Sequence, residues 1–121
     1  MRITRIESIP VRVPLKKGMT TKTAHGDHVT SDYVIVKIHT DEGIVGLGEA
    51  TVSALWSGET SRSTHSAITE LLGPALIGSD PTQISRIRAV MDFLIKLNPF
   101  TKSAIEMALW DISGKAAGLP V

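Results

Sequence analysis

The stretch Tyr33-Val-Ile-Val-Lys-Ile-His-Thr-Asp-Glu-Gly-Ile-Val-Gly-Leu-Gly-Glu-Ala50 decides the fold of this chain. In its first part the apolar residues Val34, Val36 and Ile38 recur at every second position, which is the period of a β-strand. A tight reversal follows and ends in Gly43, a residue that tolerates positive φ. The rest of the stretch returns antiparallel, so the sequence predicts a β-hairpin.

A first strand is predicted upstream, where Ile9, Val11 and Val13 alternate with other residues. One proline stands inside this strand and one directly after it. Because each lacks a backbone N–H, they place the strand at a sheet edge or end it. Residues 15–30 follow, rich in Lys, Thr, Gly and His and without periodicity. So long a connection indicates a lid or a binding loop.

Gly46 and Gly48 fall on one face of the returning strand. Such glycines either leave room for a ligand or allow a helix or another backbone to approach closely. We favour close approach, because a glycine inside a strand most often marks it.

The second half predicts helices. Residues 59–72 carry a short apolar stripe that we expect Gly73-Pro74 to end. In the next helix Asp80 is expected to cap the free amides, Pro81 to take the first helical position and Gln83 to complete a capping box.

A third helix is expected to begin near Thr101 or Ser103, the latter with Glu106 at capping-box spacing. Its apolar positions follow one helix face at 105, 108, 109, 112 and 116. Gly118 and Pro120 close it. The sequence therefore predicts an α+β fold: a three-stranded antiparallel meander followed by a small helical bundle.

This last helix signal stands directly before the end of the chain at Val121, so we expect a cut at a domain boundary. Met107 and Trp110 lie off the apolar stripe of the helix. A second apolar surface of this kind predicts burial against another domain or subunit.

Composition limits the possible functions. The chain has 121 residues, enough for one domain but not for a barrel enzyme, with 42% hydrophobic residues and no apolar run near the roughly 20 that a membrane span needs. It shows no secretory signal, which by default predicts a cytoplasmic location. The net charge of +1 gives little support to nucleic-acid binding, and the absence of cysteine excludes a thiolate nucleophile.

Few residues form a chemical motif. His25-Gly-Asp-His28 is the one place where candidate metal ligands crowd together, yet such a loop is usually just solvated, and we predict no metal. His39 and His65 have no partner in the sequence. Glu49 has no second acid with which to divide acid and base work, so we expect a structural role.

The serines near His65 lack the context of a catalytic nucleophile, so helix capping explains them better. Trp56 follows the predicted sheet in a loop. It either plugs the core or contacts something that docks there, and the sequence leaves both possibilities open.

Taken together, several motifs resemble the mandelate racemase and muconate lactonizing group of the enolase superfamily. They are Arg2-Ile-x-x-Ile-Glu7, Val13-Pro-Leu15, Thr40-Asp-Glu-Gly-Ile-Val-Gly-Leu-Gly-Glu49, Gly58-Glu-Thr60, Leu76-Ile-Gly-x-Asp-Pro81 and Ala104-x-x-x-Ala-Leu-Trp-Asp-Ile-x-Gly-Lys-Ala-x-Gly-Leu-Pro-Val121. Their order and spacing cover essentially the whole chain.

The resemblance implies that residues 1–121 are an N-terminal capping domain, without the C-terminal (β/α) barrel. In this family, barrel residues remove a proton next to the carboxylate of a small substrate, and Mg²⁺ held by barrel acids stabilises the enolate. The domain alone would then be neither catalytic nor metal-binding. The whole enzyme would be a racemase, a cycloisomerase or an acid-sugar dehydratase, and a homo-oligomer.

The resemblance also implies two mobile loops that close over the substrate, matched here by residues 15–30 and 50–57. The candidate residues are Lys17, Met19, Thr20, His25 and His28 in the first loop and Ser53 and Trp56 in the second. Lys17 would attract an anionic substrate and Trp56 would supply an apolar wall. A free-standing binding or oligomerisation module, derived from such a cap, is the alternative.

Overall fold

The computed structural model describes the backbone of residues 1–14, 21–23, 26–28 and 30–121, and the side chains of residues 1–14 and 31–121. The strands are β1 (Ile3–Pro14), β2 (Thr21–Thr23), β3 (Gly26–His28), β4 (Thr30–Thr40) and β5 (Val45–Thr51). The helical segments are α1 (Ser61–Ser66), η1 (Ala67–Leu72), α2 (Gly73–Leu76), α3 (Ile84–Leu94) and α4 (Pro99–Ala117).

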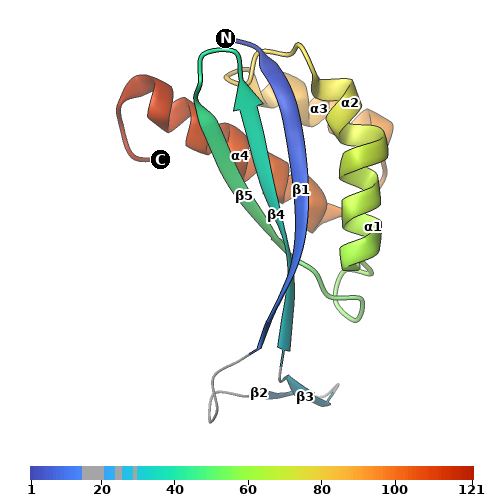
Figure 1. The fold of residues 1–121 in the computed structure, drawn as a ribbon. Helices are drawn as coiled ribbons and strands as arrows, with labels where there is room; N and C mark the ends of the chain where they lie inside the picture. Colours follow the sequence, from blue (N-terminus) through green and yellow to red (C-terminus); the bar gives the residue numbers. More distant parts are fainter. Residues whose placement is uncertain (15–20, 24–25, 29) are drawn as a thin grey trace.

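An antiparallel sheet with the order β1-β4-β5 forms one layer, and the helices cover one of its faces (Figure 1). Strands β2 and β3 form a separate two-stranded hairpin. The predicted α+β order, a three-stranded antiparallel sheet followed by helices, is confirmed. Within the described residues, no helix has both the length and the apolar character needed to cross a bilayer.

The hairpin predicted from the alternating pattern is confirmed. Val34, Val36 and Ile38 point from β4 into the core and are fully buried. Gly43 adopts a φ of 77° in the reversal, and its N–H donates to the carbonyl of Thr40 at 3.3 Å. The central strand is therefore fixed by burial and its return by the turn.

Strand β1 is an edge strand that ends at Pro14, as its prolines predicted, but it begins six residues before Ile9. In its register Ile9 pairs with Ile35 and Val11 with Tyr33. Because directly paired residues share a face, Ile9 and Val11 lie on the sheet face away from the helices. The residue of β1 that is buried in the core is Ile3.

The two strand glycines mark a close approach, as predicted. An ideal Cβ on Gly46 would lie 2.1 Å from the carbonyl oxygen of Ala108, and one on Gly48 only 1.8 Å from that of Ala104. Helix α4 therefore packs with its own backbone against β5, which no side chain at either glycine would permit.

The predicted helix end at Gly73-Pro74 is wrong, because α1, η1 and α2 continue to Leu76. The segment before the proline is π-helical, and Gly73 donates its N–H to the carbonyl of Ile68, five residues back. Proline is tolerated in the first turn of a helix, where Pro74 stands in α2.

The predicted start of the next helix is also wrong. Helix α3 begins at Ile84, and Gln83 makes no side-chain cap. The carboxylate of Asp80 instead accepts hydrogen bonds from the N–H (2.9 Å) and the hydroxyl (2.7 Å) of Thr82, so it stabilises the turn before the helix. Such a local bond competes with helix capping.

Helix α4 begins at Pro99, earlier than predicted from Thr101 or Ser103. Leu97 and Asn98 both have a φ of 56°, and Asn98 makes no side-chain cap. Glu106 does not form a capping box; its carboxylate lies 3.4 Å from the guanidinium of Arg88. At the other end Gly118 closes the helix with a φ of 69°, as expected.

Helix α4 also supplies hydrogen-bond partners along the outer edge of β5. The carboxylate of Asp111 accepts the N–H of Leu47 at 2.9 Å, and the ammonium of Lys115 donates to the carbonyl of Val45 at 2.7 Å. Asp111 and Lys115 pair with each other at 2.9 Å. Two charged side chains thus occupy backbone groups that an edge strand leaves open.

We expect Asp111→Asn to lower the free energy of unfolding by about 1 kcal/mol at pH 7, because it weakens an ion pair and a charge-assisted bond to the backbone. The hydrogen bond from Lys115 holds the pKa of Asp111 below its ordinary value. This contribution is therefore present above the ordinary pKa and is lost as the pH falls through the lowered one. Urea unfolding of both proteins at pH 7 and pH 3 measures it.

Glu49→Gln is the matched control, since Glu49 is exposed on the same strand. It should change the free energy of unfolding by less than about 0.5 kcal/mol. An Asp111→Asn effect no larger than that of the control would contradict the role of Asp111.

Candidate functional site

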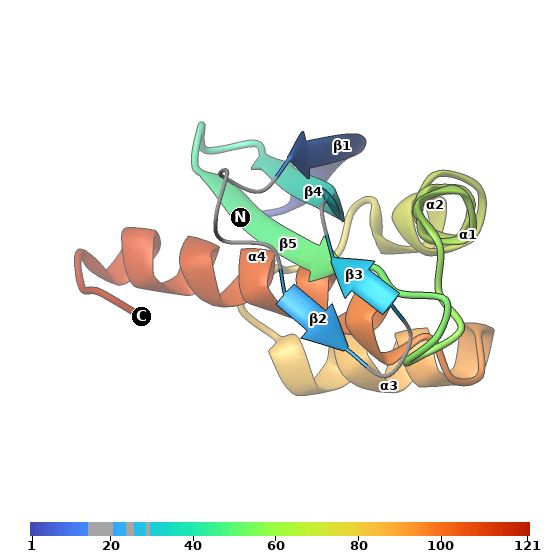
Figure 2. The ribbon, with the colours of Figure 1, turned by 90° about the horizontal axis from the view of Figure 1, so that it is seen from below.

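Two segments lie together at one end of the sheet. Strands β1 and β4 remain paired beyond the Tyr33–Thr51 pair that joins β4 to β5, as far as Pro14 and Thr30. The β2–β3 hairpin lies beyond them, and the connection from β5 to α1 leaves the sheet at the same end (Figures 1 and 2). The described part of the first predicted lid segment thus lies at the same end as the second.

Most first-loop candidates fall outside the described residues, namely Lys17, Met19, Thr20 and His25. His28 lies in β3, where its backbone pairs with Thr21, but its side chain is outside the description. The roles predicted for these five residues therefore stay predictions.

The second loop is a tight turn around Ser53. The carbonyl of Ser53 accepts the N–H groups of Trp56 at 3.2 Å and Ser57 at 3.1 Å. The side chain of Trp56 is 77% exposed, so the possibility that it plugs the core is wrong. The loop instead presents an indole ring to its surroundings.

The sequence reasoning missed Leu55, which is 66% exposed beside Trp56. Its signal was available, because residues 54–56 are three successive apolar residues in a loop. Two large apolar side chains at one loop tip form a surface suited to an apolar contact.

Asp32 contacts the strand that precedes the first loop and the residue at which the second loop begins. Its carboxylate accepts two hydrogen bonds from the guanidinium of Arg12 in β1, one from Nε at 2.7 Å and one from Nη2 at 3.4 Å. Its backbone carbonyl accepts the N–H of Val52, where the second loop begins, at 3.2 Å. The hydrogen bond from Arg12 lowers the pKa of Asp32, so this contact keeps its charge at neutral pH.

Glu59 anchors the other end of the second loop, and the sequence reasoning gave it no role. Only 2% of it is exposed. Its carboxylate accepts the N–H of Phe100 (3.1 Å), the N–H of Thr101 (2.8 Å) and the hydroxyl of Thr101 (2.6 Å). A residue 41 and 42 positions from its partners thus caps α4, and a negative charge at a helix N-terminus is favourable.

The charge of Glu59 is maintained by its partners. Burial by itself raises the pKa of Glu59, but the hydrogen bonds from Thr101, Phe100 and Ser57 lower it by more, so the net pKa lies below the ordinary value. Thr64 extends the network, because its hydroxyl lies 3.0 Å from that of Thr101. The sequence signal for this role is the Gly58-Glu-Thr60 motif.

The two histidines without a partner in the sequence both contact β1, His39 from the neighbouring strand β4 and His65 from helix α1. Nε2 of His39 lies 2.6 Å from the carboxylate of Glu7, and Nδ1 of His65 lies 2.8 Å from the hydroxyl of Ser8. The hydrogen bond with His39 lowers the pKa of Glu7. These contacts join β1 to its neighbours and explain both rings as structural.

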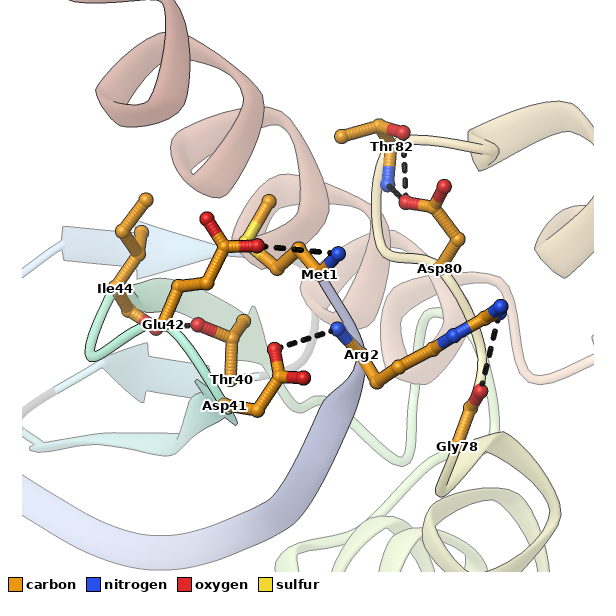
Figure 3. A network of polar contacts seen from close by, with 9 residues as sticks. All are labelled: Met1, Arg2, Thr40, Asp41, Glu42, Ile44, Gly78, Asp80 and Thr82. Atoms are coloured by element: carbon orange, nitrogen blue, oxygen red, sulfur yellow. Dashed lines mark hydrogen bonds and ion pairs between the residues drawn. The ribbon is translucent and has the colours of Figure 1, made fainter.

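A cavity of about 380 Å³ lies at the opposite end of the sheet, between the chain start and α3. Two of its polar lining residues make contacts within the chain: the guanidinium of Arg2 donates to the carbonyl of Gly78, and the carboxylate of Asp80 accepts from Thr82 (Figure 3). Figure 3 also shows Asp41 and Glu42 of the hairpin turn binding the backbone of the first two residues. These contacts hold the start of the chain against the hairpin turn.

The described side chains, at residues 1–14 and 31–121, include no group of three His, Asp or Glu that could hold a metal ion. What this part of the chain offers is a rigid sheet with loops at one end, one of which carries exposed apolar side chains.

Comparison with known families gives one match over nearly all of the chain. Residues 4–121 match the family described as "Mandelate racemase / muconate lactonizing enzyme, N-terminal domain".

Known relatives are enzymes of the same group. The chain is 38% identical over 121 residues to N-succinyl-L-Arg/Lys racemase of Bacillus cereus and 39% identical over 121 residues to L-Ala-D/L-Glu epimerase of Bacillus subtilis. Each alignment covers 100% of this chain but only 32% of the relative. This chain therefore spans about a third of the length of these relatives.

Solved structures agree. The crystal structure of the Bacillus cereus racemase superposes with a TM-score of 0.91 at 38% identity, covering 97% of this chain and 31% of that one. A dipeptide epimerase from Enterococcus faecalis, complexed with Mg and the dipeptide L-Leu-L-Tyr, superposes with a TM-score of 0.90 at 35% identity, covering 97% and 32%. The fold is thus that of the N-terminal third of these enzymes.

Proposed function

This chain belongs to the mandelate racemase / muconate lactonizing enzyme family of the enolase superfamily, as its N-terminal domain, and we propose from that premise that it caps the active site of a longer enzyme. The observation that carries the proposal is that the β2–β3 hairpin and the second loop lie at a common end of the sheet, and that the second loop exposes Leu55 and Trp56. A surface of this kind, laid over a barrel, would exclude water from the reacting atoms.

We propose that the whole enzyme removes a proton α to the carboxylate of a small substrate. The relatives include a racemase, an epimerase and a cycloisomerase. We infer that each of their reactions involves the loss or transfer of a hydrogen next to a carboxylate. Mg²⁺ would stabilise the charge that forms on that carboxylate. The described residues here do not fit a Mg²⁺ site, so we assign the ion and the catalytic base to a (β/α) barrel beyond this domain.

The residues of this domain would bind and enclose the substrate rather than react with it. Trp56 and Leu55 would form an apolar wall, and Ser53 would hold the turn that carries them. In the first loop, Lys17 would attract the substrate anion, with Met19, Thr20, His25 and His28 as further candidates for contact. Specificity would then be shared between the two domains.

The test is to sequence the source gene past the codon for Val121 and to express the whole open reading frame. We expect a barrel with a strand Lys-x-Lys motif and spaced acids, and Mg²⁺-dependent exchange of the α-hydrogen of a carboxylate substrate in D₂O, detected by NMR. The 121-residue chain alone should show none. Measurable exchange by the isolated chain would contradict the capping role.

In the whole enzyme we expect Trp56→Ala to raise KM about tenfold, with a smaller change in kcat, because the substrate loses an apolar contact of about 1.4 kcal/mol. Steady-state kinetics measures this. Trp110→Phe is the control, since Trp110 lies on α4 and not at the loop end. An unchanged KM in Trp56→Ala would show that this loop does not touch the substrate.

One observation favours a second candidate, a binding or oligomerisation module. Met107 and Trp110 are 48% and 50% exposed on α4, outside its buried face. As a cap, the chain would bury this surface against the barrel or a second copy. As a free module, it would instead form a closed dimer of defined mass, which light scattering of the isolated chain would detect.

A further inference from the structure

The second loop is held at two fixed points. At its start Val52 is buried and bonded through its N–H to Asp32. At its end the N–H of Glu59 donates to the hydroxyl of Ser57 at 3.3 Å, and the carboxylate of Glu59 binds α4. Between these points lies Gly58, with a φ of 80° and no atom within 4 Å of an ideal Cβ.

We propose that Glu59 is a positioning residue for the loop that carries Trp56. Its carboxylate ties the end of the loop to the first amides of α4, while its backbone N–H binds Ser57 within the turn. The turn from Ser53 to Ser57 then behaves as one rigid unit, because the bond between Glu59 and Ser57 spans Gly58. That the loop contacts the substrate rests on the proposed function. The positioning of the loop rests on hydrogen bonds within this chain.

The chemistry of the contact requires a carboxylate of this length. Three donors converge on its two oxygens, and two of them are backbone N–H groups, which can only donate. The amide of glutamine would turn an NH₂ group toward at least one donor. Aspartate is one methylene shorter and would lose contact with α4.

The Ser57 hydroxyl makes the link to the loop specific. It accepts the N–H of Glu59, and it also contributes to lowering the pKa of that carboxyl. A residue that only capped α4 would need no such bond to the loop. Removing the hydroxyl should therefore loosen the turn and leave α4 capped.

The test is backbone ¹⁵N relaxation of the 121-residue chain. In the wild type we expect order parameters near 0.85 at Trp56 and Ser57, and in Glu59→Gln values below about 0.6 at the same amides, with β4 unchanged. Ser57→Ala should lower the value at Trp56 similarly while the amides of Phe100 and Thr101 stay rigid. This second variant keeps the test decisive if Glu59→Gln does not fold.

Two controls separate positioning from general destabilisation. Glu49→Gln makes the same chemical change at an exposed site, and Asp111→Asn weakens the fold away from the loop. Neither should change the order parameter at Trp56. Unchanged values in both Glu59→Gln and Ser57→Ala, or a wild-type value already below about 0.6, would overturn the proposal.

The two proposals fail separately. Relaxation is measured without substrate, so it tests the positioning alone. In the whole enzyme Ser57→Ala should raise KM severalfold, as Trp56→Ala does, with little change in kcat. If the turn loosens but neither variant changes KM, Glu59 positions the loop and the capping function of that loop is wrong.

Discussion

Replacing Gly48 with alanine is expected to prevent this chain from folding stably. The new Cβ would lie 1.8 Å from the carbonyl oxygen of Ala104 and 2.9 Å from its carbonyl carbon, both of them backbone atoms that cannot rotate away. Helix α4 would have to leave β5, although it buries five apolar residues in the core: Ala104, Ile105, Ala108, Leu109 and Ile112. We expect a loss of about 4 kcal/mol or more in the free energy of unfolding.

That loss is comparable with the whole stability of a small domain, roughly 5–15 kcal/mol. Circular dichroism and urea unfolding at 25 °C would show it. Gly43→Ala is the matched control, because Gly43 has a φ of 77° with no atom within 4 Å of an ideal Cβ. It should cost only about 1–2 kcal/mol of backbone strain. If Gly48→Ala were as stable as this control, the close approach of α4 would be wrong.

The second large effect is expected from Glu59→Ala. The change removes the acceptor of the buried N–H and hydroxyl of Thr101 and of the part-buried N–H of Phe100. Removing one partner of a buried, charged network costs about 3 kcal/mol. Urea unfolding at pH 7 measures this, and Glu49→Ala, on the exposed face of β5, is the control.

The pH dependence identifies the charge as the cause. Because the folded pKa of Glu59 is lowered, its contribution is present above about pH 4.3, the ordinary pKa of Glu, and is lost as the pH falls through the lowered value. The difference in unfolding free energy between wild type and Glu59→Gln should therefore shrink as the pH falls below about 4. A difference that is constant from pH 7 to pH 3 would assign the effect to packing.

Features set by neighbours in the sequence could be predicted. The alternation of Val34, Val36 and Ile38 fixed the central strand, because burial on one face requires period two. The spacing of Gly46 and Gly48 indicated a close approach on one face, although it did not say which helix would come near.

Helix starts were predicted poorly. One helix is capped by a residue distant in the sequence, and at another the expected capping residue binds within a local turn instead. Helix α4 is capped by Glu59, about 40 positions away, which no local rule detects. Asp80 has the right composition for a cap but binds Thr82 in a turn instead. The helix end expected at Gly73-Pro74 failed because the π-helical segment leads directly into α2, in whose first turn Pro74 is tolerated.

For the candidate site, the sequence located the loops better than their residues. Trp56 stands out as a large apolar residue in a loop, and the structure exposes it. Leu55 was overlooked beside it, and the anchoring role of Glu59 depends on tertiary contacts that periodicity does not report. The first-loop candidates depend on the resemblance alone.

The binding of the outer edge of β5 by side chains of α4 has a consequence for synthesis on the ribosome. Asp111 and Lys115 lie in α4, so β5 is synthesised well before the two side chains that bind its outer edge. At about 5–20 residues per second, translation from the end of β5 to the end of α4 takes roughly 3–13 s. During that interval β5 of the nascent chain lacks the charged side chains that bind its outer edge and the helix that covers Gly46 and Gly48. Chaperones that bind extended segments would find their target there, and slower translation would prolong the exposure.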